Sequence, residues 1–89
     1  MKLARVIGTA TATAKDASLV GATLLVCDVT DGAGKVVEPG LVAADTVGAG
    51  TGDTVLIATG SAARMASGSA GPLDATIVAV VDHVTISKK

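Results

Sequence analysis

Short apolar runs separated by polar turns extend along the whole chain, and these runs are rich in Val, Ile and Thr. Such runs are typical of strands, because β-branched side chains pack well on a pleated sheet. The pattern predicts five strands, over residues 2–13, 22–29, 41–47, 54–59 and 74–82. Residues 83–87 either continue the last strand or turn to pair elsewhere. The chain therefore belongs to the all-β class.

The segments between these strands carry turn signals. Residues 31–35 contain the Asp-Gly pair of a hairpin turn, and we expect a loop through Glu38, Pro39 and Gly40. The alanine-rich residues 60–66 are the one good helix candidate. Short strands with a single helical turn predict a small closed five-stranded barrel with one short helix, because closure removes exposed sheet edges.

The first predicted strand has one face made of very small residues. Period-two alternation places Gly8, Ala10 and Ala12 on one side and threonines on the other. A face without large side chains can accept a close neighbour.

The composition limits the core that this chain can build. Its 89 residues predict a single domain over 1–89, and it has no Phe, Tyr or Trp. Small chains bury a modest share of their surface, and here the large contact areas of aromatic residues are missing as well. We therefore expect stabilisation by oligomerisation. Disulfides cannot supply it within the chain, because Cys27 is the only cysteine, and we expect it to be a buried, inert thiol.

The charge pattern argues against several classes of partner. The net charge is −1, and the charged residues are spread singly without a basic stripe. A nucleic-acid partner is therefore not expected, since phosphate neutralisation and base stacking both lack their residues. The apolar runs are far shorter than the roughly 20 residues of a membrane span. Arg5 interrupts the only apolar run near the start, so no secretion signal is predicted. We expect a soluble intracellular protein without a membrane partner.

The most unusual segment is residues 45–53, Asp-Thr-Val-Gly-Ala-Gly-Thr-Gly-Asp. It is not a dinucleotide loop, because the third glycine of the GxGxxG pattern is replaced by Asp53. It is not a Walker loop, because no lysine occurs between Lys35 and Lys88. Three glycines cost conformational entropy unless the backbone geometry requires them. Close packing where several copies meet around an axis would require them.

No catalytic or metal site is predicted. His83 follows Asp82, but one histidine and one cysteine are too few for a metal site or a triad, so we interpret His83 as a surface residue. The aspartates at strand ends suit turns, where carboxylates accept backbone amides. We therefore expect no cofactor and no metal. Arg64 follows the glycine run, and we interpret it as one half of a structural ion pair with Asp45 or Asp53, within the subunit or across to another.

Several segments in fixed order carry a resemblance to a known family. They are Arg5-Val6-Ile7-Gly8-Thr9, Thr13-Ala14-Lys15 with Leu19-Val20-Gly21, Leu24-Leu25-Val26, the glycine run 45–53, Val55-Leu56-Ile57, Gly60-Ser61-Ala62-Ala63-Arg64, and Asp74-Ala75-Thr76-Ile77-Val78 with Val81-Asp82. Together they resemble the EutN/CcmL family of bacterial microcompartment vertex proteins, over nearly the whole chain.

The resemblance implies an OB-like barrel that assembles as a cyclic pentamer and plugs the five-fold vertices of a protein shell in the bacterial cytoplasm. Flat sheets of hexameric shell proteins cannot close alone, so a pentamer supplies the curvature. This is a structural function without catalysis. The partners it implies are other copies of the chain and the hexameric shell proteins.

The resemblance also suggests which residues meet at the five-fold pore or subunit interface. These are Gly48, Ala49, Gly50, Thr51, Gly52 and Asp53 in the loop, and Gly60, Ser61, Ala62 and Arg64 in a helical element beside it. The alternative function is an OB-like module that binds a small molecule or single-stranded nucleic acid. An enzyme with a pocket at Asp82 and His83 is a third possibility.

Overall fold

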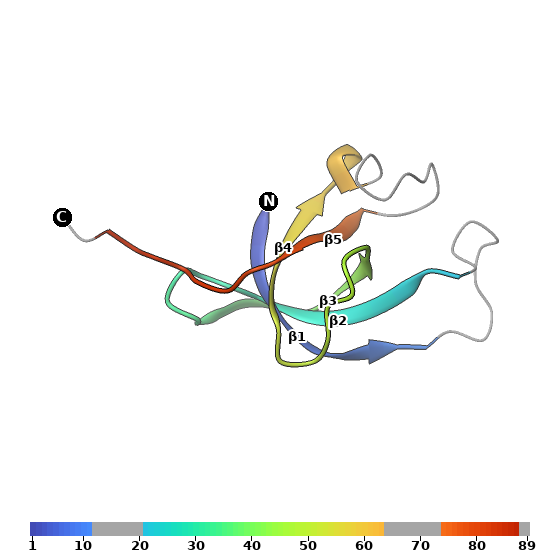
Figure 1. Ribbon diagram of the computed structural model, residues 1–89, viewed down its shortest axis with the longest axis horizontal. Coiled ribbons are helices and arrows are strands. Elements are labelled where there is room, and N and C mark those ends of the chain that lie inside the picture. The colour runs from blue at the N-terminus through green and yellow to red at the C-terminus, as the bar shows by residue number, and fades with distance from the viewer. Residues whose placement is uncertain (12–20, 64–73, 88–89) are drawn as a thin grey trace.

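The computed structural model describes residues 1–11, 21–63 and 74–87. It contains five strands: β1 (Lys2–Ala10), β2 (Thr23–Thr30), β3 (Val36–Asp45), β4 (Thr54–Thr59) and β5 (Ala75–Val80). A short helical turn follows β4, with residues 61–63 in helical conformation. Figure 1 shows this turn at the top of the view, beyond the end of β4, while the β2–β3 turn and residues 83–87 extend on the left.

The strands close into a barrel in the order β1-β2-β3-β5-β4, with β4 pairing back onto β1. All pairs are antiparallel except β3 with β5, which are joined only at Ala44–Thr76 and Asp45–Ile77. The predicted closed five-stranded barrel is therefore confirmed, with the short parallel pairing of β3 and β5 completing it.

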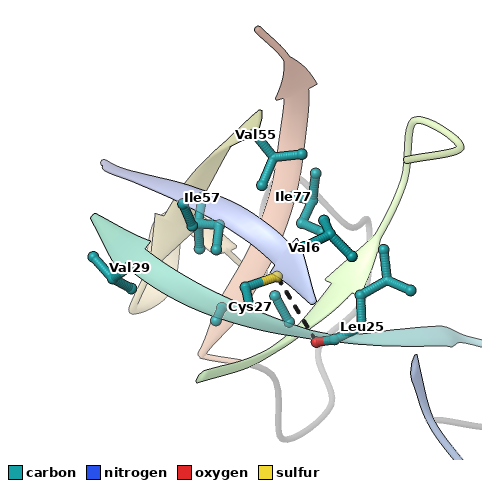
Figure 2. Close-up of a cluster of buried hydrophobic side chains, with 10 residues drawn as sticks. Val6, Leu25, Cys27, Val29, Val55, Ile57 and Ile77 are labelled. Atoms are coloured by element: carbon teal, nitrogen blue, oxygen red, sulfur yellow. Dashed lines mark hydrogen bonds between the residues drawn. The ribbon is translucent and has the colours of Figure 1, made fainter. Parts of the chain in front are cut away.

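The barrel interior is filled by aliphatic side chains from every strand. Ile57 and Ile77 are fully buried beside Val6, Val55 and Cys27, and Figure 2 shows these side chains converging between the strands. Along β2 the buried residues alternate with partly buried or exposed ones, as expected for a sheet with one face in the core. Because the core contains no aromatic residue, its packing depends on these branched side chains.

A second, smaller buried layer lies outside the barrel core, under the helical turn. Ala44, Thr76 and Ala58 are cross-strand neighbours on β3, β5 and β4, and all are buried. Ala63 is also fully buried, and the Thr76 hydroxyl donates a hydrogen bond to the Ala63 carbonyl at 2.9 Å. The helical turn is therefore fixed to the sheet by alanine packing and one buried hydrogen bond.

The loop predicted at Glu38, Pro39 and Gly40 is wrong, because these residues lie within β3. Cys27 pairs with Leu41 and Val29 with Glu38, so Pro39 and Gly40 together oppose Asp28. This is a β-bulge, and Gly40 takes the positive φ of 76° that such a kink requires. The Asp28 carboxylate accepts the Gly40 amide at 3.1 Å. A bulge lets a strand contain Pro and Gly, which usually interrupt strands.

The other predicted elements differ from the structure mainly at their ends. The boundaries of β4 match the prediction, and β2 is shifted by one residue. The first strand ends at Ala10 and the last at Val80, so residues 83–87 do not continue it as a strand. Residues 12 and 13 of the first predicted strand, and residues 64–66 of the predicted helix, lie outside the described residues.

Candidate assembly site: the glycine loop and the helical turn

The glycine loop, defined as residues 46–53, is attached to the barrel at both ends. At its start the Thr46 hydroxyl donates to the Ile77 carbonyl at 2.7 Å. At its end the Gly52 amide donates to the Val6 carbonyl, and the Val6 amide donates to the Asp53 carbonyl, both at 2.9 Å. Ala49 is partly buried and packs against the core. Hydrogen bonds at both ends and the packing of Ala49 therefore fix the loop to the barrel.

Two carboxylates hold the loop in shape. Asp45 accepts the Val47 amide at 3.1 Å, and Asp53 accepts the Gly50 amide at 2.8 Å. The Asp53 amide in turn donates to the Gly50 carbonyl at 3.0 Å. These contacts confirm the predicted turn role of Asp45 and Asp53, and they occupy oxygens that acid–base chemistry would need.

The glycines of the loop have different physical explanations. Gly48 and Gly52 have φ of 79° and 94°, a region that other residues adopt only with strain. Gly50 does not have a positive φ, and a Cβ added there would meet no atom of the described residues within 4 Å, its chain neighbours apart. Gly8 on β1 has the same two properties. Gly8, however, adjoins the β-bulge at Ile7 in the pairing of β1 with β2, where glycine is common. Nothing within the described part of a single chain explains why residue 50 is glycine.

The helical turn presents small residues to solvent. Gly60 has a positive φ of 64° and donates its amide to the Asp74 carbonyl at 2.9 Å, which fixes the chain as it leaves β4. Ser61 and Ala62 are exposed, whereas Ala63 faces the buried layer. Arg64 lies outside the described residues, so its predicted ion pair stays a prediction.

Within one chain, the end of the glycine loop and the helical turn lie far apart. They stand at opposite ends of β4, whose six residues span about 20 Å at the usual rise of a strand. Asp53 and Ser61 are therefore not side by side in one subunit. The start of the loop lies closer to the turn in the same chain, because Thr46 bonds Ile77 and the adjacent Thr76 bonds Ala63. A contact of Asp53 with the helical turn would therefore join different subunits.

The remaining candidate groups are separate. His83 and Asp82 are exposed beyond the end of β5, and in the described ranges no three potential metal-ligating side chains come together.

Burial, and then the charges of Asp28 and Asp45, raise the pKa of the Cys27 thiol, whose sulfur lies 4.0 Å from the Leu25 carbonyl (Figure 2). Among the residues that can be described, no helix is long and apolar enough to cross a membrane.

The sequence matches the family described as ethanolamine utilisation protein EutN/carboxysome over residues 1–82. The chain belongs to the EutN/CcmL family. Its relatives include the carboxysome shell vertex protein CcmL of Thermosynechococcus vestitus, which is 45% identical over 96% of this chain and 87% of that protein. This confirms the family predicted from the residue segments.

Solved EutN/CcmL structures share the barrel. CcmL from a Nostoc species is 44% identical with a TM-score of 0.88, covering 100% of both chains. GrpN from Rhodospirillum rubrum, a pentameric microcompartment shell protein, is 38% identical with a TM-score of 0.88, covering 99% of this chain and 100% of that one. Both the fold class and the family that the sequence predicts therefore agree with structures that match along the whole chain.

Proposed function

We propose that this chain is a structural vertex subunit that assembles into a homopentamer and closes the five-fold corners of a bacterial microcompartment shell. The observation that carries this proposal is the similarity along the whole chain to proteins named as shell vertex proteins, one of them from Synechococcus elongatus and 40% identical. A relative of the same fold is named as pentameric. The proposed role is mechanical, without catalysis.

The exposed surface supports a need for partners. Large aliphatic side chains are half exposed on several elements of the described chain, including Ile7, Val42, Val47 and Val80 at 48, 44, 44 and 43%. Each has apolar area to bury, and association covers such area where a small core contributes little. A ring of five copies is the assembly that fits a family with pentameric members.

The proposed ring contact includes the glycine loop and the helical turn. Because the end of the loop and the helical turn lie at opposite ends of β4, Gly50 and Asp53 of one subunit would face Ser61, Ala62 and Arg64 of the next. Gly50 supports this arrangement, since a residue that is small without an internal reason suits close approach by another backbone. We propose that Arg64 forms its ion pair with a loop carboxylate across this contact.

The further partners follow from the proposed role. A pentamer at a vertex is surrounded by hexameric shell proteins, so these are the proposed neighbours of the ring. The proposed location is the shell of a microcompartment in the bacterial cytoplasm.

The solution mass tests the assembly. Native mass spectrometry of the purified chain should give a particle of five times 8.5 kDa. A chain that stays monomeric across micromolar concentrations would favour the alternative, an OB-like binding module, because such modules act without a ring. As a control for slow assembly, chemically denatured chain is returned to buffer and its mass is measured in the same way.

A further inference from the structure

A cleft of about 220 Å³ lies on the outer side of the barrel, and we name it the outer cleft. Its floor spans three neighbouring strands. Leu3 of β1 pairs with Thr30 of β2, and both line the cleft. Arg5 of β1 pairs with Thr54 of β4, and these two line it as well. Leu3 and Arg5 flank the buried Ala4, so alternation along β1 places them on the outer face. The cleft is therefore separate from the barrel core.

One wall of the outer cleft is the β2–β3 turn, residues 31–35. The Asp31 carboxylate accepts the amides of Ala33 and Lys35 at 2.8 and 2.9 Å, both through the same oxygen. The Asp31 amide also donates to the Lys35 carbonyl at 2.9 Å. The turn is closed by its own hydrogen bonds, so this wall keeps its shape without a ligand.

The second wall belongs to residues 83–87, which follow β5 and contribute Val84 to the lining. The Val81 amide donates to the Thr54 carbonyl at 2.7 Å, which holds the start of this segment beside β4. Farther along, Ile86 lies against the turn, because a Cβ added at Gly32 would be 2.9 Å from its Cδ1 atom. Figure 1 shows the segment passing the β2–β3 turn. Gly32 therefore lets residues 83–87 seat on the turn and complete the cleft.

Arg5 is the cationic residue of the lining. It is exposed, and in the described ranges no carboxylate lies within ion-pair distance of it. Its cross-strand neighbour Asp28 accepts the Gly40 amide at 3.1 Å instead. Leu3 and Val84 add aliphatic surface to the same cleft. A guanidinium beside aliphatic side chains is suited to a carboxylate that carries a short hydrocarbon chain, because the fork of donors matches the two carboxylate oxygens.

The volume and the charges of the outer cleft limit the ligand further. An apolar cavity of about 150 Å³ holds a benzene-sized molecule, so about 220 Å³ admits a molecule with only a few more atoms. Asp31 also lines the cleft, and its charge repels a second negative charge on a ligand. A small ligand with a single negative charge is therefore favoured over a dianion such as phosphate.

We propose that the outer cleft binds a small aliphatic monocarboxylate. The carboxylate accepts hydrogen bonds from the Arg5 guanidinium, and the hydrocarbon chain lies against Leu3 and Val84. Residues 83–87 cover one side of the ligand. This inference goes beyond the proposed shell role, because it gives the chain a ligand site that does not depend on how many copies assemble.

The test is an NMR titration of the full, isotope-labelled chain with sodium butyrate. The amide signals of Gly32, Thr54 and Val84 should shift and reach saturation. Butyrate should bind about tenfold more tightly than acetate, because two more methylene groups leave water. Inorganic phosphate should bind more weakly than butyrate, because Asp31 faces its additional charge.

Three variants examine the parts of the site. Arg5→Gln should raise the dissociation constant for butyrate at least about tenfold, because it removes hydrogen bonds from a charged donor. Gly32→Ala should also weaken binding, because the added methyl group displaces Ile86 from the turn. Lys35→Gln is the matched control, since it removes one exposed positive charge from the same turn and does not line the cleft.

The outcomes decide the ligand site independently of the ring. Saturable shifts in the wild type and in Lys35→Gln, with Arg5→Gln binding at least about tenfold more weakly, support the site. The site is overturned if butyrate in millimolar excess causes no saturable shift, if Arg5→Gln binds with wild-type affinity, or if phosphate binds more tightly than butyrate. Native mass spectrometry of the same samples gives the number of copies, so a failure of the pentamer is seen separately. Should Arg5→Gln unfold by circular dichroism, the acetate and phosphate comparisons on the wild type decide the matter.

Discussion

Two alanine substitutions in the glycine loop should have opposite consequences. Gly52 has a φ of 94°, and its amide donates to the Val6 carbonyl at 2.9 Å, so the backbone cannot relax without losing that bond. An alanine forced into the left-handed region costs about 1–2 kcal/mol. Gly52→Ala should therefore lower the free energy of unfolding by about that amount, and it should do so in a single chain as well as in the ring.

Gly50→Ala should leave the single chain almost unchanged. Its φ is not positive, and within the part of the chain that the structure describes the added methyl group meets no atom within 4 Å except its chain neighbours. Reducing the freedom of the unfolded chain can even stabilise the fold by about 0.4–1 kcal/mol. If Gly50 meets a neighbouring subunit, however, the methyl group must displace that neighbour, and the ring should dissociate at higher protein concentration than the wild type.

The assay measures both properties on the same samples. Urea unfolding followed by circular dichroism, at a concentration where the wild type is dissociated, gives the free energy of unfolding. Native mass spectrometry over a dilution series gives the ring dissociation constant. The reasoning would be refuted if Gly52→Ala were as stable as the wild type, or if Gly50→Ala assembled with the wild-type constant.

Three further predictions follow from single contacts. Thr76→Val removes the buried donor to the Ala63 carbonyl and should destabilise the fold by about 1–3 kcal/mol in urea unfolding; an unchanged midpoint would show that the helical turn does not need this bond. Asp31→Ala loses two amide contacts at an exposed turn and should cost about 1 kcal/mol in the same assay, with no loss meaning that water replaces them. The raised pKa of Cys27 means that the folded chain favours the neutral thiol. Cys27 therefore contributes to the free energy of unfolding below its unfolded pKa, near 9.0, and this contribution is lost as pH rises toward the folded value. Cys27→Ala should show a weaker dependence of stability on pH above pH 9.0. Equal slopes of stability against pH in the variant and the wild type would contradict this.

The fold was largely predictable because its signals are local. β-branched runs identify β2 and β4 almost to the residue, and the Asp31 turn is fixed by its own carboxylate and backbone. The bulge at Pro39 and Gly40 was not predictable, because it depends on pairing with Asp28, twelve residues earlier in the chain than Gly40. The Pro-Gly pair, which interrupts most strands, is accommodated there by a side chain from the preceding strand, β2.

The candidate site was only partly predictable for a related reason. The glycine pattern and the aspartates that close the loop are visible in sequence, because each acts on residues a few positions away. The distinction between Gly52, which needs its φ, and Gly50, which does not, requires coordinates. The outer cleft of about 220 Å³, lined by Arg5, Asp31 and Val84 among others, was missed altogether, since these residues meet only through the barrel topology.

The most direct test of the vertex role is shell closure. Hexameric shell proteins of a microcompartment from the same organism should be co-expressed with and without this chain, and the particles imaged by electron microscopy. The account predicts closed polyhedral shells with density of five-fold symmetry at the corners when the chain is present, and open or elongated assemblies when it is omitted. Closed shells of unchanged shape without the chain, or corners that never contain it, would contradict the account.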